Sequence, residues 1–146
     1  MIYRAWEKEK GWFISPEFFN QLLLQPDGKV LWWCAESGFE DVTDRIDIQL
    51  YTGLKDSEGV ELYEGDIVDF TYWWFDGNVA ESHLIGELVY LPDCMSFGLK
   101  HVKNSEWCNH TGADVKVGDT HPFSEWLFDG ADFLKIGTAY ENPELI

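Results

Sequence analysis

Residues 49–68 read QLYTGLKDSEGVELYEGDIV, and this stretch decides the fold. Short apolar runs alternate in it with turn residues, and glycines stand at positions 53, 59 and 65, where the backbone must bend. The pattern Asp-x-x-Gly over residues 56–59 predicts a type I turn that ends in a left-handed glycine and closes a hairpin. Gly65 and Asp66 predict a second turn, which leads into a long strand over residues 67–75.

Strand patterns surround this stretch on both sides. Ile46, Ile48 and Leu50 alternate with polar residues, which predicts a half-buried strand. Further strands are expected over residues 2–6, 29–34, 82–91, 96–102 and 132–139, with a long polar excursion over residues 103–122. The class is therefore mainly β, a β-rich α+β protein.

One short helix is expected near the N-terminus. Ser15, Pro16 and Glu17 form a helix-start signal, because Ser can cap, Pro suits the first position and Glu favours the helix dipole. Apolar residues follow at helical spacing, namely Phe18, Phe19, Leu22 and Leu23. The acidic residues 35–45 predict a solvated loop or linker after the strand at 29–34.

The length of 146 residues fits one domain or two small lobes. We expect an N-terminal lobe with the short helix over residues 1–45 and a β-rich region over residues 46–146, as separate domains or around one shared core. The second region is expected to be a strongly bent small sheet or an SH3-like barrel, in which a turn such as that at Gly65 feeds a strand. This analogy concerns the fold and says nothing about function.

The central stretch resembles the signature of the YopX family. Two further pieces resemble that family in the same order along the chain, residues 3–6 (YRAW) and residues 136–145, while residues 71–132 carry no part of the resemblance. The resemblance implies a small, mainly β product of phages and prophages with no established activity, so it supplies no catalytic residues to carry over to this chain. The positions that carry the central motif are Tyr51, Gly53, Asp56, Gly59, Tyr63, Gly65 and Asp66.

The charge argues against two classes of partner. The sequence holds 10 basic and 27 acidic residues, a formal net charge of −17. Phosphate binding requires clustered Lys and Arg, so direct binding to nucleic acid or to an anionic membrane is disfavoured. No stretch reaches the ~20 apolar residues that span a bilayer, and the N-terminus lacks a signal-peptide pattern. We expect a protein of the bacterial host cytoplasm.

The sequence offers two candidate chemical sites. Cys94, His101, Cys108 and His110 offer zinc-type ligands within a short stretch, but their spacing is not that of a zinc finger or ribbon. No nucleophile-elbow, phosphate-loop or zinc-protease motif is present, and Asp66 and Asp69 should point to opposite faces of a strand. We therefore expect no enzyme, no cofactor and no metal.

Aromatic side chains instead suggest association. The segments at residues 30–33 and 70–75 are apolar on both strand faces, so they are either buried within one chain or covered by a partner. The candidate interface residues are Trp32, Trp33, Tyr72, Trp73, Trp74 and Phe75. A homo-oligomer is expected, with a host protein as a further partner.

These observations favour a non-enzymatic protein-binding or assembly protein that acts in a bacterial host. The alternative is an acidic mimic of DNA that occupies a host nucleic-acid-binding protein. A third reading is a metal-binding protein or enzyme that uses the region from Cys94 to His110.

Overall fold

The computed structural model describes residues 2–75, 79–104, 116–126 and 132–146. Its elements are mostly strands, which confirms the mainly β class. The strands are β1 (Tyr3–Glu7), β2 (Trp12–Phe13), β3 (Leu22–Leu24), β4 (Val30–Cys34), β5 (Gly38–Asp41), β6 (Ile46–Lys55), β7 (Glu61–Tyr63), β8 (Asp66–Phe75), β9 (Val79–Leu91), β10 (Ser96–Asn104), β11 (Thr120–Pro122) and β12 (Phe133–Thr138). The helical elements are η1 (Pro16–Gln21), η2 (Pro92–Cys94), α1 (Phe123–Trp126) and η4 (Pro143–Leu145).

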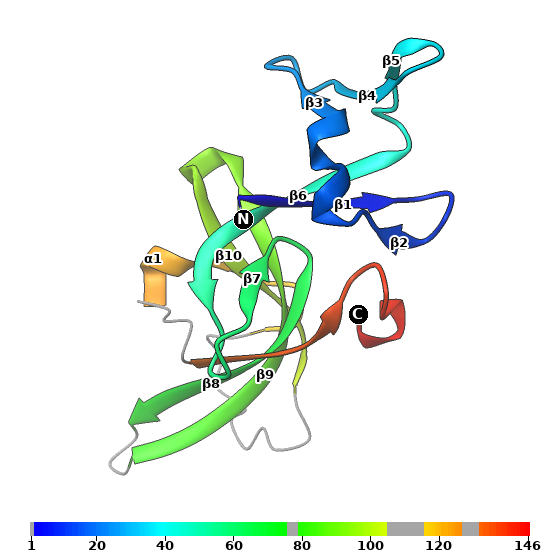
Figure 1. The fold of residues 1–146 in the computed structure, drawn as a ribbon. Helices are drawn as coiled ribbons and strands as arrows, with labels where there is room; N and C mark the ends of the chain where they lie inside the picture. The colour runs from blue at the N-terminus through cyan, green and yellow to red at the C-terminus, as the bar shows by residue number, and fades with distance from the viewer. Residues whose placement is uncertain (1, 76–78, 105–115, 127–131) are drawn as a thin grey trace. The chain divides into compact units, whose positions relative to one another are not determined.

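The chain divides into two compact units between Leu50 and Tyr51. The division falls inside β6, which is labelled in Figure 1, so this strand gives its first half to the N-terminal unit (residues 1–50) and its second half to the C-terminal unit (residues 51–146). The sequence placed the division earlier, after Arg45 in the acidic segment.

In the N-terminal unit, β1 lies between two antiparallel neighbours. On one side it pairs with β2, where Trp6 lies opposite Phe13, and on the other with β6, where Tyr3 lies opposite Leu50. A second sheet has the order β3-β4-β5. Both sheets contribute to one apolar core, which consists of Ala5, Ile14, Leu22, Val30, Val42 and Ile46.

The expected N-terminal helix is present only in part. Pro16–Gln21 form a 3₁₀ helix, and Ser15 precedes it in an extended conformation without a side-chain capping bond. Leu22 and Leu23, which the spacing assigned to the helix, lie in β3 opposite Trp32 and Leu31. Pairing with β4 buries Leu22 in the core, and this tertiary contact outweighs the local helical spacing.

The solvated loop predicted for residues 35–45 is wrong in its middle part. Gly38–Asp41 form β5, which pairs with β4 and brings the rings of Trp33 and Phe39 to 5.3 Å. The side chains of Phe39, Glu40 and Asp41 are exposed, because β5 is an edge strand. An exposed, charged edge strand has the composition of a loop, and this explains the error.

The turns of the central stretch are confirmed. Gly59 has φ +85° and its N–H donates to the carbonyl oxygen of Asp56 at 3.0 Å, so the hairpin closes through a left-handed glycine. Gly53 also has a positive φ, and the pairing of β6 with β7 shifts register between Tyr51 and Lys55 around it.

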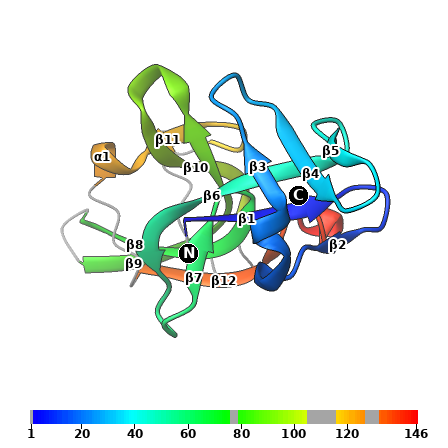
Figure 2. The ribbon, with the colours of Figure 1, turned by 45° about the horizontal axis from the view of Figure 1, so that its top comes forward.

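The C-terminal unit is built on a five-stranded antiparallel sheet with the order β11-β10-β9-β8-β12. It curls strongly into a half-barrel, which confirms the bent sheet expected from the sequence (Figures 1 and 2). Its core consists of Leu62, Val68, Phe70, Leu84, Leu88, Leu99 and Phe133. A Cβ at Gly86 would lie 2.4 Å from Cδ1 of Leu99, so only glycine leaves room for this core side chain.

Most of the polar excursion predicted for residues 103–122 lies outside the described residues. At its end, however, Thr120–Pro122 form β11 and pair with β10, where His121 lies opposite Leu99. The excursion is therefore shorter than predicted.

Two aspartates of the central motif attach to one residue of β12. The Asp56 carboxylate accepts the N–H groups of Glu58 and Val60 at Oδ1 and that of Lys135 at Oδ2, at 2.8–3.1 Å. Asp66 is fully buried, accepts the Tyr63 N–H at 2.8 Å and forms an ion pair of 3.1 Å with Nζ of Lys135. The motif is therefore connected to a strand that lies far along the chain, with 79 positions between Asp56 and Lys135.

Substitution of Asp56 should weaken folding in a pH-dependent way. Burial raises the pKa of this carboxyl, but hydrogen bonds from Val60, Lys135 and Glu58 outweigh it and lower the pKa below its usual value. Asn keeps one acceptor and turns a donor toward the other N–H groups, so Asp56→Asn should cost about 2 kcal/mol of unfolding free energy in urea at pH 7.

The pH dependence has a definite sign. A carboxyl whose pKa is lowered on folding contributes stability above its unfolded pKa of about 3.9, and this is lost as the pH falls through the folded value. The difference between wild type and Asp56→Asn should therefore shrink below about pH 4. Glu58→Gln, on an exposed side chain of the same turn, is the control. Equal stability of wild type and Asp56→Asn at pH 7 would contradict the assignment.

Substitution of Lys135 should show how much its ion pair with Asp66 contributes to stability. Lys135→Met leaves the Asp66 carboxylate buried without this cation and should cost about 2–3 kcal/mol, less than for a fully buried pair because the Lys135 side chain is 23% exposed. Asp66→Asn combined with Lys135→Met should recover part of this loss, since the buried charge is gone. Lys100→Met, on an exposed lysine of β10, should change the unfolding free energy by less than about 0.5 kcal/mol. Additive losses in the double variant would argue against the pair.

Candidate binding site in the N-terminal unit

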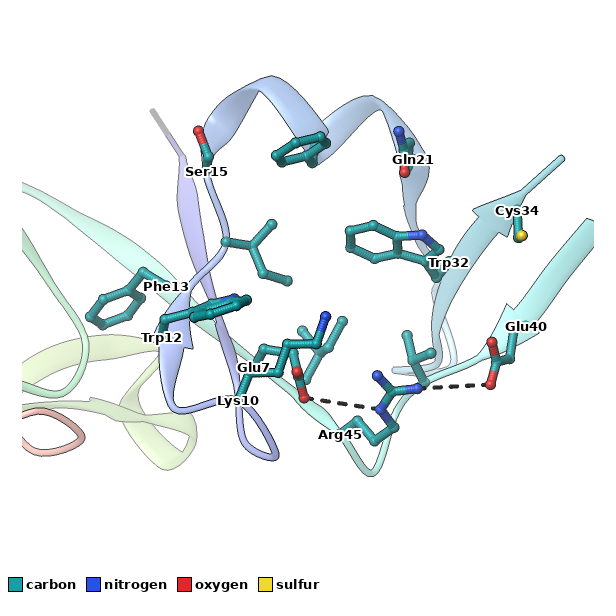
Figure 3. Close-up of a pocket in the computed structure, with 14 residues that line it drawn as sticks. Glu7, Lys10, Trp12, Phe13, Ser15, Gln21, Trp32, Cys34, Glu40 and Arg45 are labelled. Atoms are coloured by element: carbon teal, nitrogen blue, oxygen red, sulfur yellow. Dashed lines mark ion pairs between the residues drawn. The ribbon is translucent and has the colours of Figure 1, made fainter.

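A pocket of about 600 Å³ opens in the N-terminal unit. This volume lies in the range of about 300–1,000 Å³ that ligand pockets occupy. The residues that shape it come from β1, the β1–β2 turn, β2, η1, β4, β5 and the start of β6. Its aromatic side chains are Trp12, Phe13, Phe18 and Trp32, and its charged ones are Glu7, Lys10, Glu40 and Arg45 (Figure 3).

The β1–β2 hairpin places a carboxylate and an indole together. Glu7 and Trp12 lie opposite each other where the two strands meet the turn, and Gly11 closes this turn with φ +69° and an N–H bond to the Glu7 carbonyl. Since side chains alternate along a strand, Glu7 shares the face of the core residue Ala5. Glu7 is consequently only 5% exposed.

Arg45 is the centre of a loose group of charges. Its Nε lies 3.4 Å from Oε2 of Glu9 and 4.0 Å from Oε1 of Glu7, and its Nη1 lies 3.8 Å from Oε1 of Glu40. These distances exceed the 2.7–2.9 Å that is typical of a charge-assisted hydrogen bond. One guanidinium thus lies near three carboxylates, and Arg45 with these three residues carries an excess of negative charge.

Cys34 is the only thiol among the residues that line the pocket. Its pKa is lowered by the N–H of Glu36 and by the Ser37 hydroxyl and N–H, which outweigh burial and the charge of Glu40. Among the described residues that line the pocket, none is a histidine that could serve as its base.

Two of the four candidate zinc ligands lie in the described part of the chain. Cys94 lies exposed in η2, His101 is buried in β10, and Cys108 and His110 lie outside the described residues. In the described ranges, no three His, Cys, Asp or Glu side chains come together as a metal ion would require. The two described members therefore share no site.

Asp66 and Asp69 do not form a pair of catalytic carboxylates. Asp66 is bonded to Tyr63 and Lys135, whereas Asp69 contacts Nδ1 of His83 at 3.3 Å. The Thr71 hydroxyl contacts the same imidazole nitrogen at 3.3 Å. The carboxylate of Asp69 and the hydroxyl of Thr71 thus approach the same imidazole nitrogen.

The predicted interface residues fall in different environments. Trp32 is half-buried against the N-terminal core, Trp33 is 46% exposed, and Tyr72 packs against the C-terminal core. The backbones of Trp73, Trp74 and Phe75 pair with Glu81, Ala80 and Val79 of β9, and their side chains are not among those described. Of the described candidates, Trp33 is thus the one available on the surface.

Sequence reasoning missed the pocket itself. Glu7 and Trp12 fell outside every predicted element, and Arg45 fell in the predicted loop or linker. The one signal in the sequence was that Glu7 continues the alternation of Tyr3 and Ala5 and so falls on the buried face of its strand.

The family described as YopX protein matches residues 2–146. The chain belongs to the YopX protein family. This confirms the resemblance carried by the central motif and extends it over residues 71–132, where the sequence offered no recognisable match.

Among solved structures, the crystal structure of protein EF1440 from Enterococcus faecalis is similar, with a TM-score of 0.51 and 20% sequence identity. The match covers 99% of this chain and 96% of that one, and at this identity it supports the fold only. No curated protein matches the chain. In the described part of the chain, no helix is long and apolar enough to cross a bilayer.

Proposed function

We propose that this protein is a non-enzymatic binding protein whose N-terminal unit docks a partner protein over the aromatic pocket. The observation that carries the proposal is the pocket of about 600 Å³ with Trp12, 56% exposed, at its margin. A large indole left in water beside a hollow is a typical anchor of a protein interface.

The distribution of apolar surface supports this proposal. Among the described residues, eight of the fourteen exposed large apolar side chains fall in residues 2–50. Besides Trp12 they include Phe18, Trp33 and Phe39. Concentrated exposed apolar surface is a mark of an interaction site in a protein that must stay dissolved.

The proposed setting is the cytoplasm of a bacterium that carries the gene on a phage or prophage. The competing function, an acidic mimic of DNA, is favoured by the charge of residues 51–146, which hold 18 acidic and 5 basic residues. Such a mimic would bind through carboxylates, and its binding would fall steeply with salt. The two functions therefore predict different surfaces and different salt responses.

Affinity capture with paired variants tests the docking surface. The tagged full chain is used as bait in a lysate of the bacterium that carries the gene, beside Trp12→Ser/Phe18→Ser. Loss of two apolar anchors should lower recovery of the specific partner at least tenfold, since a buried anchor contributes about 2 kcal/mol. The matched control is Leu134→Ser/Ile136→Ser, which alters two exposed apolar residues of β12 and should leave recovery unchanged.

Recovery that is equal for wild type and Trp12→Ser/Phe18→Ser would contradict docking at the pocket. If that recovery also disappears at about 0.5 M salt, where the Debye length is only a few ångströms, the acidic-mimic function is favoured.

Self-association is a separate proposal. Trp33 and Phe39 are both exposed and contact each other on β4 and the edge strand β5, so they offer an apolar ladder to a second copy. Light scattering at high concentration should give a mass above the 16.9 kDa of one chain, and Trp33→Ser/Phe39→Ser should return it to the monomer. A monomeric wild type would contradict this proposal.

A further inference from the structure

The pocket holds a buried acceptor that its surroundings leave unused. Oε1 of Glu7 accepts the N–H of Glu9 at 3.0 Å, whereas Oε2 is buried and has no hydrogen-bond partner among the described residues. Figure 3 draws this carboxylate beside Arg45, with the rings of Trp12 and Trp32 to either side. A buried carboxylate oxygen without a donor is unfavourable, so the site gains from a group that brings one.

Arg45 does not fill this role. It lies 4.0 Å from Oε1 of Glu7 and is shared with Glu9 and Glu40, and its own buried Nε also lacks a hydrogen-bond partner of good geometry. The other cation of the pocket, Lys10, lies over the Trp12 ring at 5.4 Å from its centroid. The two carboxylates that line the pocket, Glu7 and Glu40, are balanced by Lys10 and Arg45, and Glu9 adds a further carboxylate beside Arg45.

We infer that the pocket takes an arginine side chain of the partner protein, its guanidinium on Oε2 of Glu7 and its plane against the indoles. A guanidinium is the group that offers both planar stacking on Trp and directed N–H donors to a carboxylate. The acidic chain as a whole attracts a basic partner over longer distances. This inference rests on the proposed docking function and specifies the chemistry of the residue that docks.

The probe is a blocked Gly-Arg-Gly peptide, and its reference is the same peptide with citrulline. Citrulline has the shape of arginine without the charge, so the comparison isolates the ion pair. In a titration of the ¹⁵N-labelled full chain, the indole N–H signals of Trp12 and Trp32 should shift saturably with the arginine peptide. The citrulline peptide should bind about tenfold more weakly.

Glu7→Gln should weaken the arginine peptide about tenfold and leave the citrulline peptide nearly unchanged. Glu17→Gln, on an exposed carboxylate of η1 that does not line the pocket, should alter neither. If Glu7→Gln fails to fold, the comparison of the two peptides on the wild-type chain still decides the inference.

Equal binding of the two peptides, or no shift of Trp12 and Trp32 with the arginine peptide, would overturn the inference. The docking function is tested separately, by comparing partner recovery with the wild-type chain and with Trp12→Ser/Phe18→Ser. If the double variant loses the partner but the wild-type chain does not bind the arginine peptide, the docking function is supported and only the arginine inference is rejected.

Discussion

The fold of the C-terminal unit depends on the attachment of β12 to the central motif through Lys135. Its N–H donates to Asp56 and its ammonium group pairs with the buried Asp66, so one residue is fixed by two carboxylates from two consecutive turns. The backbone continues the attachment, since the Ser57 N–H donates to the Phe133 carbonyl at 2.9 Å. The hairpin formed by residues 54–60 is thereby fixed to the edge of the curled sheet, which orders the start of β8.

This attachment gives a structural reason for the turn residues of the central motif. Asp56 and Gly59 shape one turn, Gly65 and Asp66 the next, and both acids reach a strand near the end of the chain. Their identity is required by backbone geometry and by burial of charge. A motif can therefore be specific and still be structural rather than catalytic.

The sequence predicted those parts of the fold that depend on local chemistry. Asp-x-x-Gly and the strand at residues 67–75 were correct because turn preference and β-propensity act within a few residues. Leu22 and Gly38–Asp41 were misassigned because their state is set by pairing with β4, which local spacing does not encode. The contact between Asp56 and Lys135 could likewise not be predicted, since no local pattern in either segment indicates its partner.

The candidate site was harder to predict for the same reason. Glu7 and Trp12 meet in a hairpin, but Trp32 joins them from β4 and Arg45 from the turn that precedes β6. Trp32 and Trp33 were recognised as notable from the sequence, whereas their division into a pocket wall and a surface ring depends on the pleat of β4.

The position of strand β6 determines how this protein can be divided into fragments. Its first half is hydrogen-bonded to β1 and its second half to β7, while the two compact units divide between Leu50 and Tyr51. A proteolytic or genetic cut at that point would remove the covalent continuity of a paired strand and leave a new strand end on each fragment. Free strand ends with apolar neighbours invite intermolecular pairing, so fragments meant to isolate either half should keep the whole of β6.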